Sequence, residues 1–329
     1  MQPDSHHKKA KILINFVDFW HEPTDEMIRK NPIYYLLKKR WDLVLSDNPD
    51  YLIYSNSGFE YKRFQCLRIF YTGENIRPNF NECDYAFSFD YPITKRNYRL
   101  PLYRFYSSYR KLFEPRVPKQ IISQKRKFCC FLVSNPKAKE RIKFFDLLNS
   151  YKHVDSGGLV RNNIGYRVSR DNTEDWLSGY KFSIVFENES YPGYTTEKLQ
   201  NALVTNTIPI YWGNPLIAKD YNPKAFINCH DFSSFSEVVK QVEKIDNDPS
   251  LYFQYLNEPF VSDMKENSFC NIDNILNRFD NIFRENKCFI SPVKKKFHKF
   301  QYYPEKSIRY IFKKIKNTFL KMRNFQLSS

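Results

Sequence analysis

Residues 181–215, KFSIVFENESYPGYTTEKLQNALVTNTIPIYWGNP, form the stretch that decides the fold. By residue type the stretch begins with an apolar β-rich run at 181–187, followed by a Pro-Gly turn within 188–194. A helical pattern that threonine 195 or 196 can cap comes next, and a second strand follows at 207–212. Strand, helix and strand in this order predict a βαβ unit. Its crossover requires parallel strands, so the sequence predicts an α/β fold.

Polar side chains gather where the unit changes from strand to helix. Parallel α/β sheets bind ligands beyond the carboxyl ends of their strands. A helix N-terminus with a lysine in its first turn suits an anion such as a diphosphate, because the lysine adds a full charge to the free amides. Taken alone, the TEK triplet is better explained as a solvated first turn. The residues at this edge are Glu187, Asn188, Tyr194, Glu197 and Lys198.

The complete string is more specific than the triplet. It contains Phe186-Glu187-Asn188, then Tyr194-Thr195-Thr196-Glu197-Lys198, then Ile208-Pro209-Ile210-Tyr211-Trp212-Gly213. With these gaps the string resembles the donor-binding motif of the α1,3/4-fucosyltransferases, glycosyltransferase family 10. The resemblance implies a GT-B architecture, in which two Rossmann-like domains face a central cleft.

Strands and helices alternate on both sides of a predicted linker at 111–126, which carries prolines and charges but little periodicity. Before the linker we expect strands at 11–17, 43–46, 52–55, 67–71 and 84–89, and a helix at 31–39. After it we expect strands at 127–133, 153–158 and 225–229, and helices at 139–148, 172–180, 235–245 and 272–283. We assign 1–118 to an acceptor-binding domain, 119–290 to a GDP-fucose-binding domain and 291–329 to a basic tail.

Composition excludes several other classes. Only 8 glycines occur in 329 residues, and neither a GxGxxG nor a GxxxxGK[ST] string is present, so dinucleotide-binding and P-loop functions receive little support. The 7 cysteines form no CxxC pair, which fits reduced thiols in a cytosolic protein. The N-terminal residues lack the apolar segment of a signal peptide. No run of 18 apolar residues predicts a transmembrane helix.

The general base is predicted from the string Tyr71-Thr72-Gly73-Glu74-Asn75, which follows a strand. Bacterial members of the family carry TGEN here, and the resemblance implies that Glu74 accepts the proton of the GlcNAc 3-hydroxyl. The reaction would be an inverting transfer of fucose from GDP-β-L-fucose to N-acetyllactosamine-type glycans, producing Lewis x-type antigens on lipopolysaccharide. An exposed turn carboxylate is the alternative explanation of Glu74.

Two cations are predicted to stabilise the departing diphosphate. Lys198 is one, and Arg141 is the other, because the family shows an SN-x(5–6)-R string here and a planar guanidinium can hold two phosphate oxygens. Without the resemblance, Arg141 would be a surface residue. Ser134 and Asn135 begin this string and either bind the donor or cap a helix. The resemblance also implies that ribose, base or fucose contacts Asn188, Tyr194 and Glu197.

No metal or other cofactor is predicted. The triplet Asp246-Asn247-Asp248 has the Asp-x-Asp pattern of a metal site, but it follows a helix and runs into Pro249, so we expect a turn. For the acceptor, the family places contacts in the first loop, which carries Trp20, His21 and Glu22.

Positive charge is concentrated at the C-terminus. The formal net charge is +16, and from Arg284 onward 13 basic residues face only Glu285 and Glu305. Apolar residues recur at helical spacing through Ser307–Met322 with lysines between them, which predicts a basic amphipathic helix on an anionic membrane surface. We therefore expect a cytoplasmic protein held peripherally on the inner face of the membrane. A helix docked on the body is the alternative.

Other functions stay open at this stage. The nearest alternative is an α1,4 or dual-specificity α1,3/4-fucosyltransferase. A protein of another class would keep the fold but lack catalysis and bind membrane or RNA through its tail. We expect no nucleic-acid partner, and the sequence leaves the oligomeric state undecided, since no heptad repeat is visible.

Overall fold

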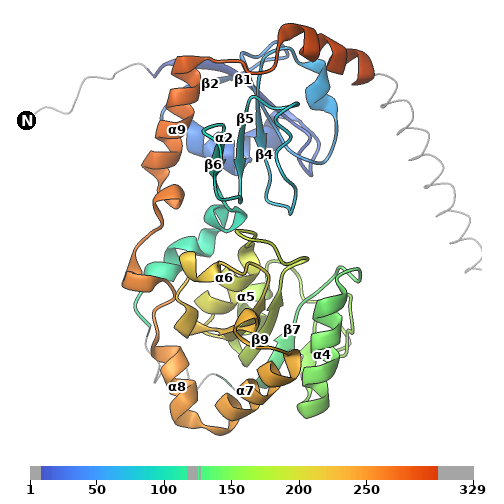
Figure 1. Ribbon diagram of the computed structural model, residues 1–329, viewed down its shortest axis with the longest axis vertical. Helices are drawn as coiled ribbons and strands as arrows, with labels where there is room; N and C mark the ends of the chain where they lie inside the picture. Colours follow the sequence, from blue (N-terminus) through green and yellow to red (C-terminus); the bar gives the residue numbers. More distant parts are fainter. Residues whose placement is uncertain (1–8, 117–124, 126, 303–329) are drawn as a thin grey trace, which may run out of the picture.

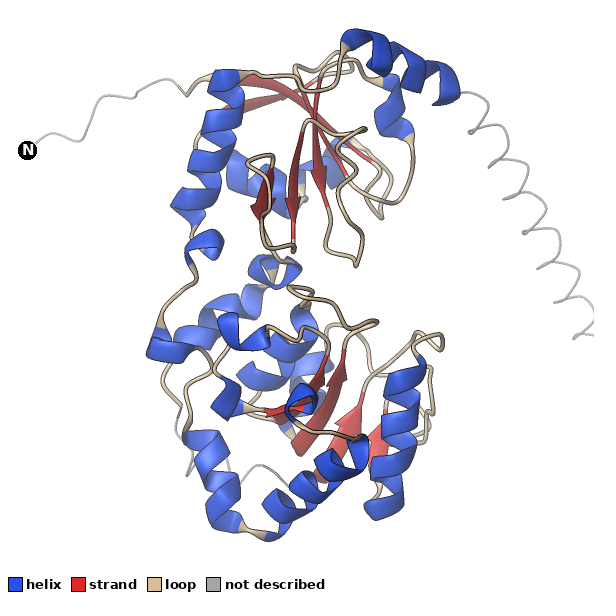
Figure 2. Ribbon diagram, in the orientation of Figure 1, coloured by secondary structure: helices blue, strands red, loops and turns tan. Residues whose placement is uncertain are grey.

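The computed structural model describes residues 9–116, 125 and 127–302. They form two α/β domains, one above the other in Figure 1, each built on its own parallel sheet. The upper sheet has the strand order β2-β1-β3-β4-β5-β6, and the lower sheet has the order β11-β10-β9-β7-β8. Two parallel-sheet domains agree with the predicted GT-B architecture. Figure 2 shows helices flanking the strands of both sheets.

The strands confirm most of the expected positions. In the upper sheet they are β1 (Lys11–Val17), β2 (Asp42–Leu45), β3 (Tyr51–Tyr54), β4 (Leu67–Tyr71), β5 (Tyr85–Ser88) and β6 (Asn97–Arg99). In the lower sheet they are β7 (Lys127–Phe131), β8 (Val154–Ser156), β9 (Tyr180–Phe186), β10 (Ile208–Trp212) and β11 (Ile227–Asn228). Strand β6 was not predicted, because its three residues contain no apolar run.

The labelled helices are α1 (Asp25–Arg29), α2 (Pro32–Leu37), α4 (Lys139–Tyr151), α5 (Thr173–Ser178), α6 (Glu197–Val204), α7 (Phe235–Asn247), α8 (Pro249–Asn257) and α9 (Ile272–Glu285), with short 3₁₀ turns between them. Residues 292–302 are also helical. Two short helices, α1 and α8, were not expected. The turn predicted for Asp246-Asn247-Asp248 is wrong for its first two residues, which end α7, and only Asp248 lies between the two helices. Asp248 caps α8 by accepting hydrogen bonds from the N–H groups of Ser250 and Leu251 at 2.9 and 3.0 Å.

The predicted domain boundaries are wrong at both ends of the second domain. The chain leaves the first domain near Pro101, since Leu100 packs in the upper core, whereas Tyr103, Tyr109 and Leu112 pack with α6 in the lower domain. The predicted linker at 111–126 lies too late in the sequence for this crossing.

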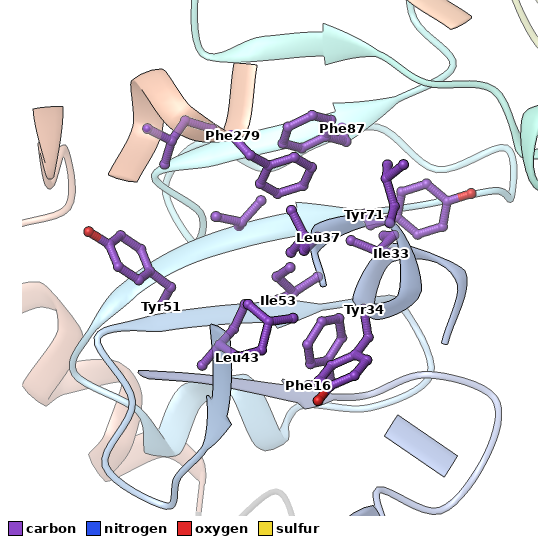
Figure 3. Packing of buried hydrophobic residues seen from close by; sticks show 14 of the residues in the cluster. Phe16, Ile33, Tyr34, Leu37, Leu43, Tyr51, Ile53, Tyr71, Phe87 and Phe279 are labelled. Atoms are coloured by element: carbon purple, nitrogen blue, oxygen red, sulfur yellow. The ribbon is translucent and has the colours of Figure 1, made fainter. Parts of the chain in front are cut away.

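Helix α9 was assigned to the second domain but belongs to the first. Five of its side chains lie in the core of the upper sheet: Ile275, Leu276, Phe279, Ile282 and Phe283. Phe279 stacks on Phe87 of β5 with ring centroids 4.2 Å apart, as Figure 3 shows. The Tyr51 hydroxyl donates to the Phe283 carbonyl at 3.0 Å. An amphipathic pattern predicts that a helix is half-buried, but it does not identify the sheet that the helix covers.

The start of the predicted tail is docked on the first domain. Residues 292–302 are helical, and Lys295 and His298 point inward and are buried. The Lys295 ammonium lies 2.9 Å from a carboxylate oxygen of the buried Asp84, and the His298 Nδ1 lies 3.0 Å from an Arg68 nitrogen. This part of the predicted tail therefore packs on the body of the protein. The predicted Ser307–Met322 helix lies outside the described residues.

The two domains also meet in a buried ion pair. Arg99 of β6 donates to the carboxylate of Asp220 in the second domain at 2.7 Å, with both side chains almost fully buried. The same guanidinium donates to the carbonyl of Gly193 at 3.3 Å. Among the described residues, no helix is both long and apolar enough to cross a membrane.

Candidate active site between the two domains

Strand β9 brings the central motif to the edge of the lower sheet. It pairs in parallel with β7 and β10, and Trp212 of β10 lies opposite Phe186, so both strands end at one level. Every residue of β9 but Lys181 is buried, as expected of a strand covered on both faces of its sheet. Glu187 and Asn188 therefore emerge at the carboxyl edge, facing the first domain.

Glu187 is fully buried at this edge. One carboxylate oxygen accepts the Thr196 N–H at 2.7 Å, and both oxygens lie 2.9 Å from the Thr196 hydroxyl. The ammonium of Lys198 lies 3.1 Å from the second oxygen. A buried carboxylate requires such partners, because an unpaired charge in the interior is very costly. The motif thus folds around Glu187, which the sequence analysis placed at the edge but gave no role.

Space for Glu187 comes from Gly213. A Cβ atom on Gly213 would lie 2.6 Å from the Cγ of Glu187, closer than side chains tolerate. The glycine that ends the motif thus leaves room for the carboxylate of the neighbouring strand.

Lys198 was expected as a free cation, but it is paired with Glu187. Burial lowers the pKa of Lys198, yet the Glu187 and Glu197 carboxylates outweigh this effect and leave the pKa raised. The side chain as a whole remains 30% exposed. The predicted threonine cap is correct in position only. Thr196 occupies the N-cap position of α6, but its hydroxyl bonds to Glu187 and not to the helix backbone.

Arg141 reaches the same edge from α4. One guanidinium nitrogen donates to the Phe186 carbonyl at 2.9 Å and to the side-chain oxygen of Asn188 at 2.8 Å. Its Nε is buried and has no hydrogen-bond partner among the described residues. Burial lowers the pKa of Arg141, and the Glu187 carboxylate opposes that shift. A groove of about 380 Å³ adjoins it, lined in part by Asn188 and Trp212.

Ser134 and Asn135 lie between β7 and α4, and both are exposed. The Asn135 side chain accepts the N–H of Lys137 at 3.0 Å and closes a turn. Neither residue caps α4, because Ala138 holds the N-cap position. The capping alternative is therefore wrong.

Tyr194 and Glu197 flank the helix N-terminus. Tyr194 is buried against Phe89 of the first domain, with ring centroids 5.1 Å apart. Burial, and then the Glu187, Glu74 and Glu197 carboxylates, raise the pKa of Tyr194. The same tyrosine thus experiences carboxylates from both domains.

Glu74 enters this region from the first domain. It follows β4 in a tight bend, where its N–H donates to the Thr72 hydroxyl at 3.0 Å. Its side chain is exposed. Burial, and then the Glu197 and Glu74 carboxylates, raise the pKa of Tyr106 in the segment that joins the domains. Glu74 and Glu197 therefore lie near one tyrosine, although 123 residue numbers separate them. Tyr106 was not predicted, since no sequence signal marks it.

The predicted acceptor residues follow β1 in the first domain. Trp20 is exposed, and the His21 ring stacks on Phe19 with centroids 6.0 Å apart. Phe19 in turn stacks on Tyr71, which ends β4 three residues before Glu74. Glu22 is exposed, and its carbonyl lies 3.0 Å from the His21 Nδ1. These contacts bring the first loop to the same end of the sheet as Glu74.

The carboxylates of the Asp-x-Asp triplet have structural partners. Asp246 pairs with Lys181 and with Lys152, the latter at 2.6 Å. No group of three or more His, Cys, Asp or Glu residues in the described part of the chain has the arrangement of a metal site.

Comparisons with known proteins point to one family. Residues 14–106 match the model of the α-(1,3)-fucosyltransferase FucT N-terminal domain, and residues 122–284 match that of glycosyltransferase family 10 (fucosyltransferase), C-terminal part. An α-(1,3)-fucosyltransferase FucT from Helicobacter pylori is 34% identical over 75% of this chain, which spans 60% of that relative's length. A mouse 4-galactosyl-N-acetylglucosaminide 3-α-L-fucosyltransferase 9 is 31% identical over 41% of this chain and 38% of its own length.

Solved structures agree with these sequence relatives. The crystal structure of an α1,3-fucosyltransferase with GDP-fucose has a TM-score of 0.75 and 30% identity to this chain. The match covers 88% of this chain and 96% of that protein.

The buried carboxylate gives a prediction about stability. Glu187→Gln keeps the shape of the side chain but removes the charge that faces Lys198, so we expect the free energy of unfolding to fall by about 3 kcal/mol. Glu140→Gln, on the exposed first turn of α4, should change it by less than about 0.5 kcal/mol. Urea denaturation measures both. Equal stability of the two variants would show that Glu187 does not organise the edge.

Proposed function

This chain belongs to glycosyltransferase family 10, and we propose that it transfers fucose from GDP-β-L-fucose to the 3-hydroxyl of GlcNAc in N-acetyllactosamine-type glycans. The names of the relatives support the α1,3 linkage, and the nucleotide in a related crystal structure supports the donor. An α1,3 product of this kind would be a Lewis x-type antigen, with lipopolysaccharide as the proposed carrier. The closest alternative is α1,4 or dual specificity in the same fold.

The observation that supports the donor site best is Arg141, which lines the groove at Asn188 and whose buried Nε has no hydrogen-bond partner among the described residues. A buried guanidinium donor without a partner is costly, and a phosphate oxygen would satisfy it. Lys198 and the free amides at the start of α6 add positive charge at the same edge. We place the diphosphate between Arg141 and Lys198.

Local charge alone does not make this edge attractive to an anion. Two cations, Arg141 and Lys198, face two carboxylates, Glu187 and Glu197. Both oxygens of Glu187, however, are held by the Thr196 hydroxyl, and this carboxylate is fully buried. The proposed site therefore presents fixed N–H donors to a ligand, while one of the two balancing carboxylates stays buried. Donors fixed before the reaction stabilise a departing anion without reorganisation.

In the proposed reaction, Glu74 accepts the proton of the acceptor hydroxyl as its oxygen attacks C1 of fucose. The bond between C1 and the β-phosphate oxygen breaks on the opposite face, and its electron pair leaves with GDP. A single displacement inverts the β-linked fucose to an α-linkage, through an oxocarbenium-like transition state. Arg141 and Lys198 stabilise the charge on GDP, so the scheme requires no metal ion.

The remaining predicted residues are proposed to bind the substrates around the base, Glu74, and the two cations, Arg141 and Lys198. Asn188, Tyr194 and Glu197 are proposed to hold ribose, base or fucose, and Ser134 and Asn135 are proposed to contact the donor. Trp20, His21 and Glu22 are proposed to hold the acceptor, because the Phe19–Tyr71 stack brings their loop to the end of β4. An exposed aromatic ring such as Trp20 suits the apolar face of a sugar.

The base assignment gives the most direct prediction on activity. Glu74→Gln keeps the side-chain shape but cannot accept a proton, so we expect kcat to fall roughly 10²- to 10⁴-fold. GDP affinity, measured by calorimetry, should stay within about twofold, because Glu74 does not contact the diphosphate in the proposed scheme. Glu26→Gln, on the exposed helix α1, is the matched control and should retain wild-type kcat. A Glu74→Gln enzyme with near-normal turnover would remove Glu74 as the base.

We further propose that the chain associates peripherally with the inner face of the cytoplasmic membrane. The docked helix at 292–302 supports this, because its outward face is apolar: Val293, Phe297 and Phe300 are 78%, 61% and 84% exposed. Lys294, Lys296 and Lys299 are exposed between them. A surface that combines phenylalanines with lysines suits anionic lipid headgroups over an apolar layer.

The membrane proposal is tested with vesicles. The double variant Phe297→Ser/Phe300→Ser should bind phosphatidylserine-containing vesicles at least about tenfold more weakly than wild type, because it loses apolar area that enters the lipid. Ile93→Ser, at a 99% exposed position elsewhere on the first domain, should bind like wild type. Fucose transfer to a small acceptor should be unchanged in both. Equal vesicle binding by all three proteins would refute a role for this face.

A further inference from the structure

Two loops that carry the two halves of the proposed site touch each other across the domains. We call residues 72–77, which include Glu74, the base loop, and residues 188–194, which lead from β9 to the start of α6, the donor loop. The base loop belongs to the first domain and the donor loop to the second. Their contacts involve side chains to which the mechanism above assigns no task.

The first contact is a hydrogen bond. The side-chain amide of Asn75 donates to the carboxylate of Glu189. Asn75 directly follows Glu74, and Glu189 directly follows Asn188, whose side chain accepts from Arg141. The bond therefore joins the neighbour of the proposed base to the neighbour of a proposed donor-binding residue.

The second contact is a cation–π stack. The guanidinium carbon of Arg77 lies 3.3 Å from the ring centroid of Tyr191 in the donor loop and 4.4 Å from that of Phe89. Flat stacking of this kind is favourable and directional, since it fixes the ring over the guanidinium plane. Arg77 thus holds the middle of the donor loop against the first domain.

Arg77 also joins the two contacts into one unit. Its guanidinium donates to the side-chain oxygen of Asn75 at 2.8 Å, so the amide of Asn75 is turned toward Glu189. Its Nε lies 3.3 Å from Asp90, which balances the charge. A change in the Arg77–Tyr191 stack is therefore expected to alter the Asn75–Glu189 hydrogen bond, and the reverse.

The end of the donor loop is fixed to the first domain as well. Gly193 has φ +88°, and a Cβ atom there would lie 2.7 Å from the Phe89 carbonyl, so only glycine fits. Its carbonyl accepts from Arg99 of the first domain at 3.3 Å, and its N–H donates to Asn214 of its own domain at 2.7 Å. The first domain thus contacts the donor loop at Glu189, Tyr191 and Gly193.

We propose that Asn75–Glu189 and Arg77–Tyr191 form an interdomain latch that sets the position of Glu74 relative to the bound donor. This inference rests on the proposed function. Asn75, Arg77, Glu189 and Tyr191 are positioning residues, because they act on Glu74 through the base loop. Misplacing a reacting group by about 1 Å can cost about 100-fold in rate, so contacts remote from the sugar can control kcat.

The Asn75–Glu189 bond allows a test by exchanging donor and acceptor. Glu189→Gln keeps an acceptor for the Asn75 amide and should change kcat by less than about threefold. Asn75→Asp places a carboxylate against Glu189 and should lower kcat about tenfold or more. The double variant Asn75→Asp/Glu189→Gln restores a hydrogen bond in the opposite direction and should recover most of the lost kcat. The KM for GDP-fucose should change by less than about threefold throughout.

Arg77 supplies a second, independent variant. Arg77→Ala removes the stack and the brace on Asn75 and should lower kcat about tenfold or more, with GDP affinity little changed. Arg284→Ala removes an exposed guanidinium that pairs with Asp280 on α9, and it should retain wild-type kcat. If the wild type is active and both Arg77→Ala and Asn75→Asp keep the same kcat as the Arg284→Ala control, the latch proposal is wrong. The proposed function would then still stand.

Hydrogen exchange tests the latch without turnover. GDP should slow amide exchange in residues 72–77 of the wild type, although the nucleotide binds the other domain. Asn75→Asp should abolish this protection, and the double variant should restore it. If the wild type transfers no fucose, the proposed function is wrong. The amide exchange of residues 72–77 still shows whether the latch forms. No protection of residues 72–77 by GDP, or protection that survives Asn75→Asp, would overturn it.

Discussion

The proposed site depends on one buried carboxylate. Glu187 directly follows β9 in the interior of the second domain, where a charge is stable only if it is fully paired. Its partners come from Thr196 and Lys198, so the chain between them must curl back over the strand end. That return aligns the N-terminus of α6 with Arg141 on α4. The cations expected to meet a diphosphate are therefore set in place before any ligand arrives.

The second constraint is the way in which the domains are joined. The chain crosses from the first to the second domain near Pro101 and returns through α9, which packs in the core of the first sheet (Figure 1). A buried Arg99–Asp220 pair lies at the interface. Breaking such a pair leaves an uncompensated buried charge, so it resists separation of the domains. In the proposed mechanism, Glu74 of the first domain and a donor bound to the second domain work together only because this geometry is held.

Much of this could be predicted from the sequence, and the failures have physical causes. The strand–helix–strand unit at 181–215 was placed to within about two residues, because periodicity and a Pro-Gly turn are local signals. Glu74, Arg141 and Lys198 were correctly placed at strand ends or helix starts. The pairing of Glu187 with Lys198 was not predicted, because a glutamate after a strand gives no local sign that it is buried.

The C-terminal elements show the limit more clearly. Periodicity identified α9 but could not say which sheet it covers, since that choice depends on contacts distant in sequence. The docked helix at 292–302 reverses the usual pattern, with Lys295 and His298 inside and Phe297 and Phe300 outside. Its inward polar side chains contact Asp84 and Arg68, partners that no local pattern shows.

The most direct measurement of the central claim, that Arg141 and Lys198 bind the diphosphate, is a crystal structure of this chain with GDP. The account predicts diphosphate oxygens about 3 Å from both the Arg141 guanidinium and the Lys198 ammonium. A nucleotide bound away from the Tyr194–Lys198 turn would contradict it.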